Sequence, residues 1–153
     1  MRAEGTLEIA AAREDTWDAI TDPAALAACV PGAESLAIDR VSPTSFTLRG
    51  RVGQGFLSVS AEGRVDLSGL DRPSAAEAGL QGSAAGTSLE ATVAMSLEEA
   101  APGHTLVRWS ADATLTGSLA GMAQSYLDRD GPGMVLRTLE CLRARLEAEG
   151  ATA

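Results

Sequence analysis

The residues of this chain that could perform acid–base or nucleophilic chemistry are few and isolated. The single histidine, His104, follows Ala101-Pro102-Gly103, a sequence typical of a hairpin turn. A general base must lie within reach of its substrate, and an exposed turn does not provide that position, so we interpret His104 as a solvated turn residue. A cysteine nucleophile needs a lowered pKa, a base and exposure, and Cys29 has no histidine in a suitable position.

The remaining donor residues predict neither a metal site nor a phosphate site. Cys29 and Cys141 are too few and too far apart for a zinc site or a disulfide framework, so we expect both to be buried free thiols. The apolar faces of the expected strands carry no His, Cys, Asp or Glu donors that could converge on a metal. A phosphate loop lies between a strand and a helix, whereas Gly79, Gly82 and Gly86 fall between two strands, so we interpret them as bulge or hairpin glycines.

The charge of the chain argues against two classes of partner. The net charge is −9, and all twelve cations are arginines scattered along the sequence. Nucleic-acid binding needs a basic stripe that neutralises phosphates, and electrostatic binding to anionic lipid needs a basic cluster. The sequence therefore predicts neither nucleic-acid binding nor a purely electrostatic attachment to membranes.

The composition instead favours an interior with room for an apolar ligand. Hydrophobic residues make up 45% of the chain but aromatic residues only 3%, so small side chains must line much of the interior. A long helix over such a sheet either approaches it closely or leaves a cavity. For each large inward-facing residue, filling of the core is the simplest role, but methionines adapt to varied ligands. The candidate ligand-binding residues are Phe46, Leu48, Val59, Val93, Met95, Trp109, Met122, Tyr126 and Met134.

Two of these candidates could also recognise a polar group on the ligand. Trp109 carries an indole N–H and Tyr126 a hydroxyl, and each could make one hydrogen bond to a carbonyl-bearing head group.

The elements that must position these residues follow from hydrophobic periodicity. Residues 4–10 alternate as a strand, and two short helices are predicted at 15–20 and 24–28, the second capped by Asp22 and started by Pro23. Six further alternating runs predict a meander of hairpins with one buried and one solvated face. These runs span residues 35–40, 44–52, 55–67, 74–82, 87–97 and 105–115.

A long helix follows the strands. Val135, Leu139, Leu142 and Leu146 form one apolar stripe at helical spacing. Proline lacks the backbone donor and glycine lowers helix propensity, so Gly131-Pro132-Gly133 predicts a kink or a short break. The whole pattern predicts an α+β protein with a single domain at residues 1–149 and a disordered tail at 150–153. No signal peptide or membrane-spanning segment is recognised, so we expect a cytoplasmic protein.

Several segments also match the pattern of a known family. Its most specific segment is Cys29-Val30-Pro31-Gly32-Ala33-Glu34. The other matching segments are Gly5-Thr6-Leu7-Glu8-Ile9, Thr16-Trp17-Asp18-Ala19-Ile20-Thr21-Asp22-Pro23, Leu26, Gly79-Leu80-Gln81-Gly82 with Gly86, and Leu115-Thr116-Gly117-Ser118-Leu119-Ala120. As a set, spanning residues 5–123 and part of the last helix, they resemble the CoxG family, which is named after the G subunit of carbon monoxide dehydrogenase.

The resemblance implies a START-like, birch-pollen-allergen-like helix-grip (SRPBCC) fold, in which a curved seven-stranded antiparallel sheet wraps around a long C-terminal helix. It also implies a non-catalytic accessory protein for a molybdenum hydroxylase of the carbon monoxide dehydrogenase type. Such a protein recruits the enzyme to the inner face of the membrane, or carries a quinone or another apolar small molecule, with no covalent cofactor. Longer members carry a C-terminal tail proposed to reach the membrane, whereas this sequence stops at Ala153, and ligand binding does not need that tail.

Two other functions remain open at this point. The same fold supports enzymes of the polyketide cyclase or dehydratase type, which require polar side chains inside the cavity. The sequence offers Tyr126 for this, and Arg49 or Arg51 if the strand register shifts. The third hypothesis is a pure protein-interaction module with a solid core.

Overall fold

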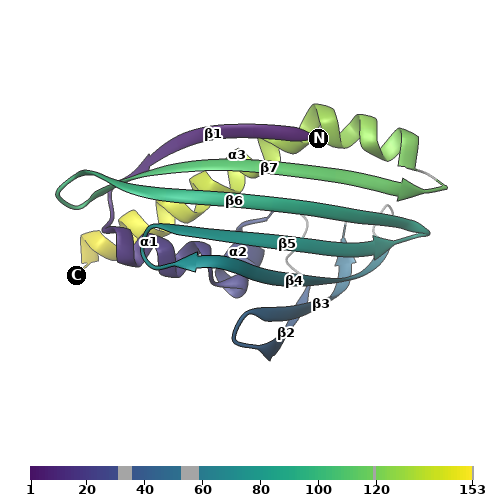
Figure 1. The fold of residues 1–153 in the computed structure, drawn as a ribbon, viewed down its shortest axis with the longest axis horizontal. Helices are drawn as coiled ribbons and strands as arrows, with labels where there is room; N and C mark the ends of the chain where they lie inside the picture. The colour runs from purple at the N-terminus through teal and green to yellow at the C-terminus, as the bar shows by residue number, and fades with distance from the viewer. Residues whose placement is uncertain (31–35, 53–58, 119, 153) are drawn as a thin grey trace.

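The computed structural model describes residues 1–30, 36–52, 59–118 and 120–152, and its elements follow the predicted order (Figure 1). The first half comprises β1 (Arg2–Ile9), α1 (Arg13–Ile20), α2 (Pro23–Cys29), β2 (Ala37–Ser42) and β3 (Ser45–Val52). The second half comprises β4 (Val59–Asp71), β5 (Ala75–Ala84), β6 (Thr87–Ala101), β7 (His104–Gly117) and α3 (Ala120–Thr152).

Some predicted boundaries lie outside the described residues. These are the start of the predicted strand at residue 35, the first part of the predicted strand at residues 55–58, and the last residue of the predicted tail. The last helix extends beyond residue 149, where the sequence analysis placed the end of the domain.

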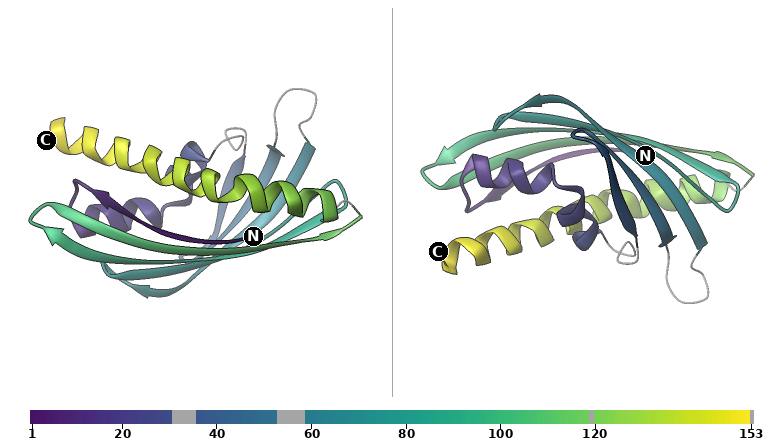
Figure 2. Two further views of the ribbon diagram at one scale, coloured as in Figure 1. Left: turned by 90° about the horizontal axis from the view of Figure 1, so that it is seen from above. Right: turned by 90° about the horizontal axis from the view of Figure 1, so that it is seen from below.

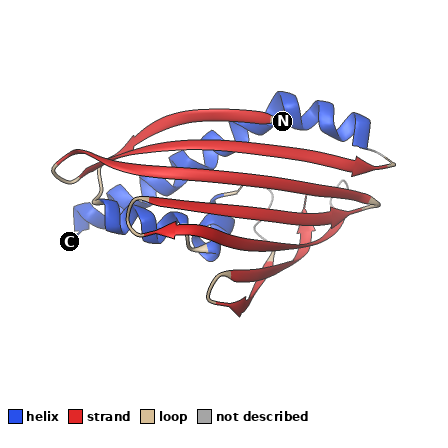
Figure 3. Cartoon of the chain, viewed as in Figure 1, coloured by secondary structure: helices blue, strands red, loops and turns tan. Residues whose placement is uncertain are grey.

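The seven strands form one antiparallel sheet in the order β1-β7-β6-β5-β4-β3-β2. Strands β2 to β7 are successive neighbours, as the predicted hairpins require, and β1 pairs with the free edge of β7. The sheet is curved and all three helices lie on its concave side (Figures 2 and 3). The α+β helix-grip architecture expected from the sequence is therefore confirmed.

One local and one long-range hydrogen bond fix the two short helices. The Asp22 carboxylate accepts a hydrogen bond from the Ala24 backbone N–H at 3.0 Å, the capping role predicted for it. The Trp17 indole N–H donates to the Ala75 carbonyl at 2.9 Å, which ties α1 to the start of β5. These contacts hold α1 and α2 against one end of the concave face.

The hydrophobic core lies at that same end, under the C-terminal half of α3. The predicted stripe of α3 faces the sheet there, and its main contacts are with β1, β7, α1 and α2. Leu139 is only 1% exposed and belongs to the buried core, to which β1, β6 and β7 also contribute side chains. The buried residues of this core include Leu7, Ile9, Ile20, Leu97, Val107, Trp109, Ala111, Leu142 and Leu146.

The predicted break in the last helix is not formed. Helix α3 runs without interruption from Ala120 to Thr152, with Pro132 inside it. Gly131 lies so close to the Met1 side chain that a methyl group there would clash with it, whereas a Cβ at Gly133 would make only an ordinary contact, 3.6 Å from Arg137. Tertiary packing against β1 therefore overrides the low local helix propensity.

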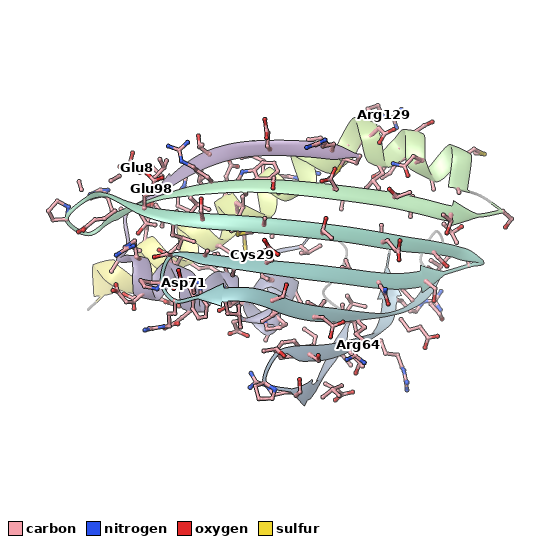
Figure 4. All side chains as sticks on the ribbon, viewed as in Figure 1. Glu8, Cys29, Arg64, Asp71, Glu98 and Arg129 are labelled. Carbon is pink, nitrogen blue, oxygen red and sulfur yellow. A yellow bond between two sulfur atoms is a disulfide. The ribbon has the colours of Figure 1, made fainter. Side chains whose placement is uncertain are left out.

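The expectation of free thiols is wrong. Cys29 at the end of α2 and Cys141 in α3 form a disulfide, with their Cα atoms 5.6 Å apart. Figure 4 shows this bond behind the sheet, next to the Cys29 label. Sequence separation misled the prediction, because the cysteines are 112 positions apart and the segment between them contains β2 to β7, which return α3 to α2.

We expect Leu139→Ala to lower the free energy of unfolding by roughly 2–5 kcal/mol, because it leaves a cavity that α3 and the sheet cannot close. The matched control is Leu136→Ala, the same change on the outer face of the same helix, where the side chain is 41% exposed. It should cost less than about 1 kcal/mol. Urea denaturation of both variants measures the difference, and equal losses would contradict this placement of the core.

Candidate ligand-binding groove

The part of the concave face away from the core carries an unusual row of residues. Strand pairing places Leu48, Gly63, Gly82, Leu89 and Leu115 directly opposite one another across β3 to β7. Residues opposite each other in an antiparallel sheet lie on the same face. The two central strands therefore present bare backbone between leucines on either side.

This row forms the floor of an open apolar groove of about 270 Å³, which we call the concave groove. Its described lining comes from β3 to β7, together with Leu36, and none of these residues belongs to a helix. Helix α3 is therefore not seated on this part of the wall. The lining residues are Leu36, Leu48, Ala61, Glu62, Gly63, Leu80, Gly82, Ser83, Ala84, Thr87, Leu89 and Leu115.

The polar chemistry around the groove is sparse. Glu62 is the only ionisable residue of its described lining, and it is exposed. Arg49 lies directly opposite Glu62 in the sheet and is also exposed, and Arg51 donates to the Ser60 hydroxyl at 3.3 Å on the same outer face. The register shift that would turn these arginines inward has not occurred.

The carboxyl groups with shifted pKa values lie away from the groove. Hydrogen bonds from Ser45 and Arg64 lower the pKa of Asp66 on the outer face of the sheet. The bidentate contact with Arg72 lowers the pKa of Asp18 on α1. Both shifts favour ionised surface carboxylates, and neither supplies the protonated acid that a catalytic groove would use at neutral pH.

The third carboxyl group with a lowered pKa, that of Asp128, takes part in the contacts that attach the first half of α3 to the sheet. The N-terminal amine of Met1 lies 2.9 Å from the Asp128 carboxylate and, together with Gln124, lowers its pKa. Gln124 in turn accepts a hydrogen bond from the Leu115 backbone N–H at 2.8 Å. These polar contacts hold α3 at the edge of the sheet next to the groove.

The structure separates the nine candidate ligand-binding residues into several environments. Leu48 lines the groove, and Phe46 is buried in the neighbouring row, opposite Val65. Val93, Met95 and Trp109 lie further along the concave face, in or against the core. Val59 and Met134 are half-buried and are not part of the groove lining.

The other two candidates do not face inward. Met122 is 80% exposed and Tyr126 is 56% exposed, both on the outer side of α3, where the Arg129 guanidinium lies 5.7 Å from the Tyr126 ring. The sequence pattern placed them on an inner stripe because they are four residues apart. The stripe that faces the sheet in this half of the helix instead contains Gln124, Leu127 and Asp128.

Trp109 has a distinctive environment. It is 7% exposed, and its indole ring packs so closely over Gly5 that a Cβ there would lie 3.0 Å from the ring. Its Nε1 is the one buried side-chain nitrogen or oxygen in the described part of the chain without a hydrogen-bond partner. A buried unpaired donor is costly and rare in native proteins.

His104 begins β7 beside the turn, as predicted. Its Nδ1 lies 3.5 Å from the Glu8 carboxylate on β1, and its side chain is exposed. It lies at the end of β7 opposite to the groove residue Leu115, so it does not contribute to the groove.

Comparison with known proteins identifies the family. The family described as the G subunit of carbon monoxide dehydrogenase (CoxG) matches residues 5–147. The chain belongs to the CoxG family. The resemblance found in the sequence is thereby confirmed, and CoxG proteins are by description one component of a larger enzyme. No curated protein sequence matches the chain.

Solved structures show that the CoxG chain shares its fold with START-superfamily proteins. A conserved protein from Geobacillus kaustophilus is 14% identical with a TM-score of 0.83, covering 97% of this chain and 96% of its own. A START superfamily protein from Mycobacterium smegmatis is 16% identical with a TM-score of 0.64, covering 95% and 98%. The ZhuI aromatase/cyclase from Streptomyces sp. R1128 is 14% identical with a TM-score of 0.67, covering 96% and 93%.

The two facing glycines of the CoxG chain should respond differently to a methyl group. A Cβ at Gly63 would lie 2.7 Å from the Gln81 carbonyl oxygen, whereas a Cβ at Gly82 would lie 3.5 Å from its nearest neighbour. We expect Gly63→Ala to destabilise the protein by roughly 1–3 kcal/mol through this clash. Gly82→Ala should change stability by less than about 1 kcal/mol. Chemical denaturation tests the pair, and the reverse order would contradict the register.

Proposed function

We propose that this protein is a non-catalytic accessory protein that binds a lipophilic molecule in the concave groove and serves a carbon monoxide dehydrogenase-type molybdenum hydroxylase. The observation that carries the proposal is the groove itself, an apolar depression on the concave face whose described lining contains no helix residue. Membership of the CoxG family supports the link to the hydroxylase.

The size and lining of the groove support an apolar ligand of moderate length. The groove has a volume of about 270 Å³. A water molecule takes up about 30 Å³ in the liquid, so this volume equals that of roughly nine water molecules. Burial of each methylene contributes about 0.8 kcal/mol, so several such groups offset much of the entropy lost on binding. A quinone with an aliphatic chain is a ligand of this kind.

None of the helices in the described chain is apolar over the length that a bilayer crossing needs.

The unpaired indole N–H of Trp109 supports a ligand that carries a carbonyl group. Trp109 and Leu115 both face the concave side of β7 and are six residues apart, a distance of about 20 Å along a strand. A ligand that extends from the groove under α3 spans this distance with a ring and a short chain. Its carbonyl oxygen then satisfies the buried donor.

The rival function is an enzyme of the aromatase/cyclase type. The ZhuI aromatase/cyclase and a norcoclaurine synthase from Thalictrum flavum have similar folds. Acid–base catalysis on this fold requires ionisable side chains facing the substrate. The described groove lining has one, the exposed Glu62. The composition of the groove therefore favours binding without catalysis.

A groove-filling variant tests the proposal. Gly82→Leu places a side chain in the groove, and we expect it to weaken the binding of decylubiquinone at least tenfold, as measured by titration and native mass spectrometry. The matched control is Gly79→Leu, the same change on the same strand but on the outer face, opposite Asp66. It should bind like the unsubstituted protein. Equal affinities of the two variants, or no binding by the unsubstituted protein, would refute a ligand site in the groove.

The role of Trp109 can be tested separately. Trp109→Phe removes the unpaired N–H and keeps an aromatic ring, so we expect weaker binding of decylubiquinone by about fivefold to tenfold, the value of one hydrogen bond. Binding of pyrene, a hydrocarbon probe that cannot accept this hydrogen bond, should change less than twofold. Equal losses for both probes would show that the ring, and not its N–H, matters.

The hypothesis of a pure protein-interaction module predicts docking to the enzyme that does not depend on ligand binding. If docking to purified carbon monoxide dehydrogenase persists unchanged in a variant with a filled interior, such as Val93→Trp, and no ligand is bound, that hypothesis replaces ours. Under our proposal the protein binds decylubiquinone without the enzyme present.

A further inference from the structure

The Cys29–Cys141 disulfide joins the two helices whose positions define the covered end of the concave face. Cys29 is the last residue of α2, and Cys141 lies between the core residues Leu139 and Leu142 of α3. The bond is the only disulfide possible in the chain, which has two cysteines. Its cleavage would leave α2 and α3 held together by noncovalent contacts.

The two sulfur atoms are not equivalent. Cys29 is 7% exposed, whereas Cys141 is half-buried, so an external thiol reaches Cys141 more easily. The Arg145 guanidinium Nη1 lies 3.9 Å from the Cys29 sulfur. A nearby cation stabilises a thiolate, and a more stable thiolate is a better leaving group in thiol–disulfide exchange.

We propose that this disulfide is a reversible redox switch that controls how fast a ligand extending from the concave groove under α3 to Trp109 enters and leaves. The inference rests on the function proposed above and concerns the regulation of the same site. A cytoplasmic location, expected from the sequence, is one where disulfides are uncommon and usually serve reversible chemistry. The asymmetry of the two sulfurs fits such a bond.

The exchange is a balanced two-electron step with a dithiol reductant. A thiolate of the reductant attacks the Cys141 sulfur, the protein S–S bond breaks, and Cys29 leaves as a thiolate next to Arg145. The second thiol of the reductant then attacks the mixed disulfide and releases the Cys141 thiolate. The reductant becomes a disulfide, the protein gains two electrons, and the two thiolates take up protons according to their pKa values.

Helix α3 connects this bond to the groove. Its first half is attached to the groove residue Leu115 through Gln124 and to β1 through Asp128. Its second half is attached through the disulfide and through Glu147, which accepts a hydrogen bond from the Ala10 backbone N–H at 2.9 Å. With the disulfide open, α3 loses its covalent attachment to α2 and can move away from the concave face more often, which opens a path between the groove and Trp109.

The test compares ligand exchange in the two redox states of the full chain. We expect decylubiquinone to dissociate at least fivefold faster from protein reduced with dithiothreitol than from the oxidised protein, as followed by stopped-flow fluorescence. The dithiothreitol is removed under anaerobic conditions before the quinone is added, so that it reduces the disulfide and not the probe. The double variant Cys29→Ser/Cys141→Ser should show the fast rate with or without reductant. Equal rates in both redox states, with ligand still bound at equilibrium, overturn the switch and leave the proposed function intact. Loss of binding in both states refutes the proposed function itself.

The role of Arg145 has a readout that needs no ligand. In the reduced protein, Arg145→Gln should slow the alkylation of Cys29 by iodoacetamide at neutral pH and shift its pH profile to higher pH, because the thiolate loses its neighbouring cation. Arg137→Gln, the same change at an exposed position of α3, is the matched control and should leave the profile unchanged. Identical profiles for the two variants contradict the assignment of Cys29 as the leaving thiolate.

Discussion

The structure depends on the apolar stripe of α3, which extends over only the second half of the helix. Helix α3 has 33 residues, but its large core side chains are confined to its second half, from Val135 to Leu146. That half buries against β1 and β7 and excludes water from one end of the concave face. The first half presents Gln124 and Asp128 to the sheet and is held by polar contacts at the sheet edge. The other end of the concave face is left without a covering helix for this reason.

The uncovered end of the concave face exposes little apolar area, because many of its strand residues are small. A sheet of this size would normally fill its inner face with branched side chains. Here two glycines oppose each other between Leu48 and Leu89, and alanines occupy neighbouring positions. The groove therefore exposes backbone and a few leucine side chains. An apolar ligand can cover this surface, and without a ligand the exposed apolar area is small.

Most of the fold could be predicted because periodicity determines it. The alternation in residues 59–67 and 87–97 specifies the buried face, and Asp22-Pro23 specifies the start of α2. The disulfide and the continuity of α3 could not be predicted, because both result from contacts between segments far apart in the sequence. Gly131 lies against the side chain of Met1, at the other end of the sequence, and the sheet brings Cys29 next to Cys141 across a sequence separation of 112.

The candidate site was harder to predict, because the space in it is left by two glycines, Gly63 and Gly82. Reasoning from the sequence favoured bulky residues and so found Leu48 but passed over Gly63 and misjudged Gly82, which was interpreted as a bulge or hairpin glycine. Both lie within strands, and the signal that could have found them is the pairing of the two glycines once the register of the β4–β5 hairpin, whose turn lies between Asp71 and Ala75, is known. Register, more than composition, decides where this fold leaves space. A glycine pair moved by one position would face the solvent, and the concave wall would then be closed by the side chains of the adjacent residues.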